Sequence, residues 1–86
     1  MKEIIGWTLC KVHADYRTHG LYETYNDAHY AHIGRRNGKT EKIVAVCDDG
    51  YCYEAVFGYD DEVVNLRPLP LFGSIGNGAV KFDGVK

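Results

Sequence analysis

The fold follows from residues 42–57, which read KIVAVCDDGYCYEAVF. Two runs rich in β-branched and aromatic side chains flank Asp49 and Gly50, and this pattern is the strongest short-range signal for a β-hairpin. Asp and Gly accept the positive φ angles of a type I′ turn, whose twist suits the two strands. A two-residue loop at this pair predicts that Cys47 faces Cys52 across the hairpin.

The segments on either side of the hairpin predict an α+β domain, with an antiparallel sheet of about four or five strands and one helix packed on it. Residues 4–12 carry apolar side chains on both faces, with Ile5, Trp7 and Leu9 together on one face, which predicts a central strand. Further short strands are expected at residues 20–24, 63–66 and 79–82.

A helix is predicted over residues 25–36. Thr24 has the side-chain oxygen that an N-cap needs, and the Asn-Gly pair at 37–38 supplies a left-handed stop. The small side chains of Ala28 and Ala31 lie on one stripe, so we expect them to face the sheet.

The bulk composition fits a single domain spanning residues 1–86. The net charge of −2 does not favour a nucleic-acid-binding protein. The charge is uneven, because residues 1–43 carry seven Lys or Arg and five Asp or Glu, whereas residues 44–86 carry three and seven. The second half therefore has a net charge of −4, which complements a basic partner surface.

The chain shows neither a signal-peptide pattern at its start nor an apolar run of membrane-spanning length. It has three cysteines, and an odd number is unusual in a secreted disulfide scaffold. We therefore expect a cytoplasmic protein.

The first candidate site is a metal centre. Cys10, His13, Cys47 and Cys52 are the ligand types of a Cys₃His zinc site, and the predicted hairpin would bring the last two together. Cys10 and His13 point to opposite faces of a flat strand, so the chain would have to bend between them. The alternative is that the cysteines are small buried side chains, and no cofactor is then needed.

The second candidate is a surface rich in tyrosine. The chain has seven tyrosines, more than one small core can use, and tyrosine is enriched in protein interfaces. The partner-binding residues that we predict share an acidic setting in the second half of the chain: Tyr51, Tyr59, Asp60, Asp61 and Glu62. The alternative is that the tyrosines are half-buried sheet residues.

Four weaker patterns are more typical of ordinary structure. His29 and His32 lie one helical turn apart, residues 67–70 read RPLP, and residues 73–78 are glycine-rich. These favour, respectively, a surface pair, an extended connection and a turn. The fourth pattern is a modest basic patch made of Arg35, Arg36, Lys39 and Lys42. The alternative interpretation of these residues is an ordinary helix end exposed to solvent.

One stretch carries a family resemblance. The strand running into a capped helix at residues 20–28, followed by the hairpin at 42–57, resembles small accessory proteins of phages and mobile elements, including anti-CRISPR proteins. The resemblance implies a protein that binds and blocks a larger complex in the host cytoplasm. It assigns no functional residue.

The sequence thus favours a non-enzymatic binding or inhibitory module that docks on a larger, basic protein or nucleoprotein complex. The alternatives are a small zinc-stabilised domain and an oligomeric protein that binds a small ligand between subunits. Direct contact with nucleic acid is the least favoured function, because the basic patch is small.

Overall fold

The computed structural model describes residues 2–12, 16–35, 41–69 and 80–82. In these ranges the chain forms a six-stranded antiparallel sheet and one helix, which confirms the predicted α+β domain. The elements in chain order are β1 (Ile4–Lys11), β2 (Thr18–Tyr22), α1 (Tyr25–Arg35), β3 (Glu41–Cys47), β4 (Tyr51–Phe57), β5 (Val63–Arg67) and β6 (Val80–Lys81). No helix within those ranges is long and apolar enough to cross a membrane.

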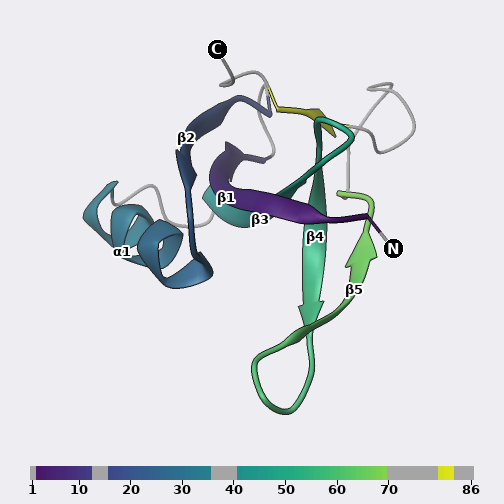
Figure 1. The fold of residues 1–86 in the computed structure, drawn as a ribbon. Coiled ribbons are helices and arrows are strands. Elements are labelled where there is room, and N and C mark those ends of the chain that lie inside the picture. Colours follow the sequence, from purple (N-terminus) through teal and green to yellow (C-terminus); the bar gives the residue numbers. More distant parts are fainter. Residues whose placement is uncertain (1, 13–15, 36–40, 70–79, 83–86) are drawn as a thin grey trace.

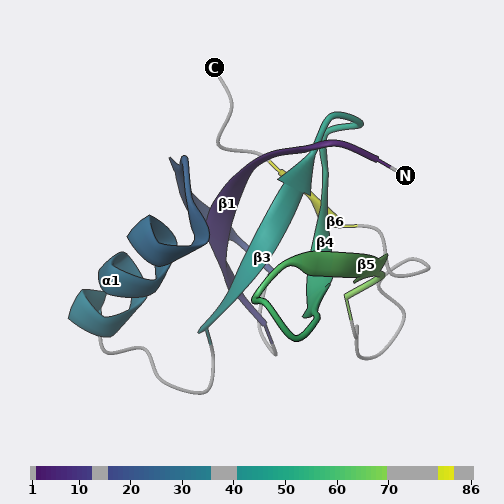
Figure 2. The same cartoon turned by 60° about the horizontal axis from the view of Figure 1, so that its bottom comes forward.

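The strands are arranged in the order β2-β1-β3-β4-β5, and β6 pairs with the start of β4. The first strand is central, as predicted, because it pairs with β2 on one side and β3 on the other. Helix α1 and strand β5 lie at opposite ends of the sheet in both ribbon views (Figures 1 and 2). The helix contacts β1, β2 and β3 and so covers one end of the sheet.

The hairpin exists, but its predicted register is wrong by one residue. Cys52 pairs with Val46, so Cys47 and Cys52 do not face each other. The N–H of Gly50 donates to the carbonyl of Cys47 at 3.0 Å, and Gly50 has a φ of 85°. The loop is therefore a three-residue turn that ends in a left-handed glycine. Asp49 favours it, because its carboxylate accepts a hydrogen bond from the N–H of Tyr51 at 3.0 Å.

Two predictions for the first strands also need correction. Ile5 was expected beside Trp7 on a buried face, but it is exposed, because the pairing of β1 with β3 shifts between Ile4 and Gly6. A bulge of this kind turns one residue out of the alternation. The second strand begins at Thr18 rather than at residue 20, since Thr18 is already paired with β1.

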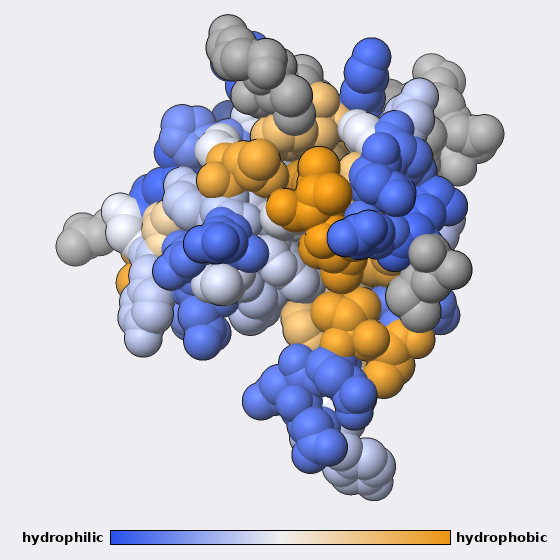
Figure 3. All heavy atoms as spheres, viewed as in Figure 1, coloured by the Kyte–Doolittle hydropathy of each residue, from blue (hydrophilic) through white to orange (hydrophobic). Residues whose placement is uncertain are grey.

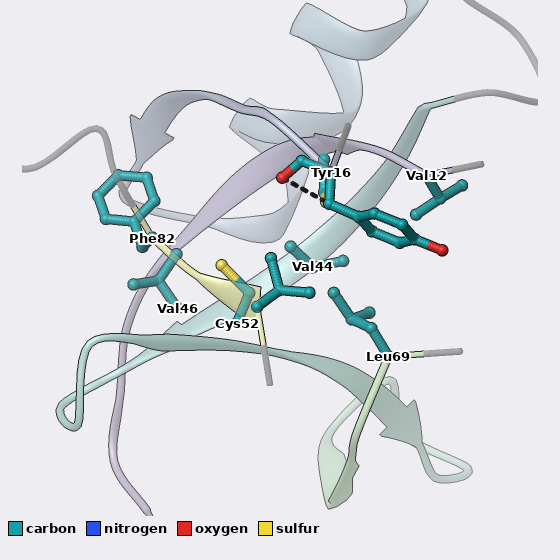
Figure 4. Close-up of a cluster of buried hydrophobic side chains, with 9 residues drawn as sticks. Val12, Tyr16, Val44, Val46, Cys52, Leu69 and Phe82 are labelled. Carbon is teal, nitrogen blue, oxygen red and sulfur yellow. Dashed lines mark hydrogen bonds between the residues drawn. The ribbon is translucent and has the colours of Figure 1, made fainter. Parts of the chain in front are cut away.

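One face of the sheet encloses a closed apolar core. Its nine residues come from four strands and from the segments beside them, and all are at most 7 % exposed (Figure 4). They are Cys10, Val12, Tyr16, Val44, Val46, Cys52, Leu69, Val80 and Phe82. The last three come from the C-terminal third of the chain, so this part of the sequence closes the core.

The other face is only partly covered. Helix α1 places Ala28 against Trp7, Leu9 and Ala45, and Ala31 lies at the edge of this cluster, as predicted. Towards β4 and β5 the cluster ends in partly buried side chains, which include Ala55, Val63 and Leu66. In Figure 3 a band of apolar atoms reaches the surface and continues onto the β4–β5 hairpin, which ends in a hydrophilic tip.

Candidate functional site

Three aromatic rings from distant parts of the sequence meet on the partly covered face. Trp7 of β1 lies 5.2 Å from Tyr25 of α1 and 6.0 Å from Phe57 of β4, measured between ring centroids. The Tyr25 and Phe57 rings lie 5.1 Å apart at 70°. Trp7 is buried, whereas Tyr25 and Phe57 are 37 % and 38 % exposed. The cluster therefore rests on a buried ring and presents two rings to solvent.

Local sequence explains how Tyr25 reaches this position. Thr24 caps the helix as predicted, because its side-chain oxygen accepts a hydrogen bond from the N–H of Asp27 at 3.1 Å. This cap makes Tyr25 the first helical residue. Ala28, one turn later, is fully buried, and its small side chain lets the first turn lie close to the sheet.

A hollow of about 470 Å³ lies beside the two exposed rings. Its lining combines the start of α1, the end of β4 and the acidic loop that follows β4: Thr24, Tyr25, Asn26, Phe57 and Asp61. Asp61 has a φ of 58°, a left-handed conformation that Asp tolerates better than most residues do. One residue of the predicted acidic surface, Asp61, thus lines the same hollow as the exposed rings of Tyr25 and Phe57.

The surroundings of this hollow are strongly acidic. The two segments that meet there, residues 20–30 and 55–64, carry five Asp or Glu and no Lys or Arg. All five acidic residues are exposed. An anion would be repelled here, whereas a cation would meet carboxylates and ring faces together.

A second hollow, of about 410 Å³, lies where β3 and β4 diverge. The two strands pair only at Ala45 with Tyr53 and at Val46 with Cys52, although both continue beyond these pairs. The hollow is lined by helix residues and by the two diverging strands: Tyr25, His29, His32, Glu41, Lys42, Ile43, Val44, Glu54, Ala55 and Phe57. Tyr25 and Phe57 line both hollows.

The predicted partner-binding residues do not form one surface. Tyr51 opens β4 and Tyr59 follows its end, so about 25 Å of extended strand separates them. Tyr59, Asp60, Asp61 and Glu62 stay together at the exposed tip of the β4–β5 hairpin (Figure 1). The structure therefore supports the acidic loop as one unit and separates Tyr51 from it.

The cysteines do not gather as a zinc site requires. Cys10 and Cys52 share the closed core, whereas the register of β3 and β4 places Cys47 on the opposite face. Burial, with nearby Asp49, raises the pKa of the Cys47 thiol, which disfavours the thiolate that a metal binds. Within the described residues no three potential ligands form a group, and His13 lies outside them.

The two helical histidines have different surroundings. His29 stacks on Tyr25 with ring centroids 6.4 Å apart, and His32 bonds through Nδ1 to Glu41 Oε1 at 2.9 Å. Both histidines line the second hollow, but their rings make different contacts.

The RPLP segment, the glycine-rich loop and the basic patch are described only in part. Leu69 in the RPLP segment is buried in the closed core, and Pro70 and the glycine-rich loop at 73–78 lie outside the described residues. In the basic patch, Arg35 binds Glu41 and Lys42 binds Glu54, while Arg36 and Lys39 are also not described.

We compared the chain with family models, curated proteins and solved structures, and none of them matched it.

No pattern in the sequence marks Tyr25 and Phe57 as site residues. Tyr25 is the first residue of a helix and Phe57 is the last residue of a strand, and an aromatic side chain at either position is equally consistent with ordinary core packing. Only the crossing of α1 over the sheet brings their rings together. The acidic loop was visible in the sequence because its three carboxylates are consecutive.

Proposed function

We propose that this protein is a non-enzymatic binding module that recognises a basic segment of a larger protein. The supporting observation is that Asp61, from the acidic loop, lines the same hollow as the exposed rings of Tyr25 and Phe57. A lysine or arginine side chain entering this hollow would meet both partners that a cation prefers, a ring face and a carboxylate.

The setting favours a basic segment over a single small cation. Asp61 is flanked in the chain by the exposed Asp60 and Glu62, and the fully exposed Tyr59 lies in the same loop. Exposed carboxylates act over about 8–10 Å at physiological salt, so several cationic side chains in a row gain more from this loop than one cation does. Tyr59 adds a rigid side chain with a polar tip, which is common in protein interfaces.

Binding of this kind suits an inhibitor. Lys- and Arg-rich segments are also the parts of proteins that bind the phosphates of nucleic acids. A module that occupies such a segment competes with the nucleic acid for it. The proposed function therefore fits the resemblance to the accessory proteins of phages and mobile elements, including inhibitors of host defence.

The test is titration with a peptide rich in Lys and Arg, followed by backbone amide shifts in nuclear magnetic resonance spectra. We expect shifts at the start of α1 and in residues 57–62, and weaker binding at high salt. Asp61→Asn should weaken binding about fivefold, which corresponds to about 1 kcal/mol. Asn also tolerates the left-handed backbone at this position, so the fold is kept.

Asp48→Asn is the matched control. Asp48 is also an exposed aspartate in a hairpin turn, but it lies at the other end of β4. It changes the net charge by the same amount, so equal affinities of the two variants would show that only overall charge matters and would refute the proposed site. Phe57→Ala should weaken binding without any change in charge.

A further inference from the structure

The hollow beside Tyr25 and Phe57 presents aromatic surface in two directions. The Phe57 ring stacks on the buried Trp7 ring at 16°, so one of its faces packs on Trp7 and the other is turned away from it. The Tyr25 ring is inclined to Phe57 at 70°, with the two centroids 5.1 Å apart. Because Trp7 also contacts Tyr25 at a centroid distance of 5.2 Å, one buried ring supports both exposed rings.

The charge around this hollow is one-sided in the segments that adjoin it. Residues 20–30 and 55–64 are all described and contain no Lys or Arg. Asp61 lines the hollow, and the exposed Glu23 and Asp27 lie on either side of the helix start in the chain. The first turn of a helix carries partial positive charge, which opposes a small and concentrated cation. The hollow therefore suits a cation whose charge is spread over a larger group.

An unmodified lysine fits this setting less well than a methylated one does. Its ammonium group is compact and strongly hydrated, and it has three N–H donors. Asp61 offers carboxylate oxygens, whereas ring faces accept N–H groups only weakly. The ammonium therefore exchanges part of its hydration for weaker contacts, which costs binding free energy. Methyl groups in place of N–H groups reduce this cost, keep the positive charge and add apolar contact with the rings.

We propose that the hollow takes a methylated lysine side chain of the partner, and takes the dimethylated form best. This inference rests on the proposed function and names the ligand of the same site. A dimethylammonium group has one N–H for the Asp61 carboxylate and two methyl groups for the rings. A trimethylammonium group keeps the contact with the rings but has no N–H to donate. The volume of about 470 Å³ is large enough for either group.

The first experiment compares one short basic peptide in three forms, in which the central lysine is unmodified, dimethylated or trimethylated. Isothermal titration calorimetry measures the three affinities. We expect the dimethylated peptide to bind about fivefold tighter than the unmodified one, and the trimethylated peptide to lie between them. Amide shifts at residues 24–26, 57 and 61 would locate the binding in the hollow.

Two variants separate the contribution of the rings from that of the carboxylate. Tyr25→Leu keeps an apolar side chain but removes a ring, so the preference for methylated peptides should be lost. Tyr30→Leu is the matched control, because Tyr30 is a tyrosine of the same helix that is 73 % exposed and does not line the hollow.

Asp61→Asn tests the carboxylate. Asn tolerates the left-handed backbone at this position, so the fold is kept. The neutral amide accepts a weaker hydrogen bond from the dimethylammonium N–H, so the dimethylated and trimethylated peptides should then bind to within about twofold of each other.

A further arm identifies the source of the methylated cation. Choline carries the same trimethylammonium group without a peptide. Weaker binding of choline than of the trimethylated peptide would support a methylated lysine within a partner. Choline that binds as tightly as this peptide would assign the hollow to small free cations and would overturn the inference.

Two other results would also overturn the inference. Equal affinities of the three peptides, with amide shifts in the hollow, would reject the preference for methyl groups and leave the proposed function intact. A preference for methylated peptides that persists in Tyr25→Leu would show that the ring does not recognise them. If none of the peptides binds, the proposed function itself is rejected, and this inference with it.

Discussion

The two faces of the sheet bury their apolar side chains in different ways. On the closed face, residues from four strands and the neighbouring segments surround one another, and none of the nine core residues is more than 7 % exposed. On the open face, the helix covers β1 and β3, but Tyr25 and Phe57 remain more than one third exposed. Packing therefore leaves aromatic surface exposed on this face.

The short length of helix α1 explains why the open face is less completely buried than the closed face. Eleven residues form about three turns, and these turns lie over β1, β2 and β3. The end of β4 and strand β5 extend past this cover at the opposite end of the sheet (Figure 2). The apolar side chains there are only partly buried, including Val63 and Leu66.

The open face also has polar side-chain interactions at its rim. Glu41 binds His32 and Arg35, and the Tyr53 hydroxyl donates to Asp49 at 2.5 Å. In the closed core, Cys10 Sγ donates to the carbonyl of Tyr16 at 3.7 Å. We therefore expect the open face to respond to pH and charge changes and the closed face to respond to loss of volume.

The largest expected effect on stability comes from removing one phenylalanine ring from each face and comparing the two losses. Phe82 is 4 % exposed in the closed core, so Phe82→Ala should lower the free energy of unfolding by about 3–5 kcal/mol. Phe57 is 38 % exposed, so Phe57→Ala should cost only about 1–2 kcal/mol. Urea denaturation measures both. Equal losses would show that the faces are packed alike, and Phe82→Leu keeps the comparison measurable if Phe82→Ala unfolds.

The next effect concerns the buried carboxylate beneath the helix end. Glu41→Gln should lower the free energy of unfolding by about 1–3 kcal/mol, because two charge-assisted hydrogen bonds are replaced by weaker ones. Arg35 and His32 can still reach solvent, which keeps the loss below that of a fully buried pair. A loss no greater than that of Glu54→Gln, a similar change at an exposed ion pair, would contradict this account.

A third effect concerns pH. The hydrogen bond to Asp49 raises the pKa of Tyr53 to about 12 from its ordinary value of 10.0. A folded-state pKa above the unfolded one contributes stability that is fully present below pH 10 and is lost as the pH rises towards 12. The same bond lowers the pKa of Asp49 below 3.8, so its contribution disappears as the pH falls below that value.

The measurement for this pair is the ultraviolet absorbance of phenolate against pH. In Asp49→Asn the pKa of Tyr53 should fall from about 12 towards 10.0, whereas Asp48→Asn should leave it high. An unchanged pKa of Tyr53 in Asp49→Asn would show that the hydrogen bond to Asp49 does not raise it.

The smallest effect is expected at the ion pair across the two diverging strands. Lys42 Nζ lies 3.6 Å from Glu54 Oε2, and both side chains are more than one third exposed. Lys42→Gln should change the free energy of unfolding by less than about 0.5 kcal/mol, and the difference should vanish at high salt. A loss above about 1 kcal/mol would show that this pair holds β3 and β4 together.

Local sequence predicted the elements well because their signals are short-range. The Asp-Gly turn, the Thr24 cap and the alternation in residues 4–12 each depend on a few neighbouring residues. The hairpin register was wrong because the Asp49 side chain and Gly50 stabilise a three-residue turn, and both turn types suit the same residues. The shift of one residue in register places Cys47 on the face opposite Cys52, so these two predicted zinc ligands lie apart.

The sequence by itself determined the α+β class, the strands and helix, and the acidic character of the β4–β5 loop, because propensity, capping and charge are local properties. Only the tertiary structure decided which side chains meet. Tyr25, Phe57 and Asp61 lie in different elements, and they line one hollow only because the chain folds the start of α1 against the end of β4. Strand order and register place these residues, and both depend on contacts between distant parts of the chain.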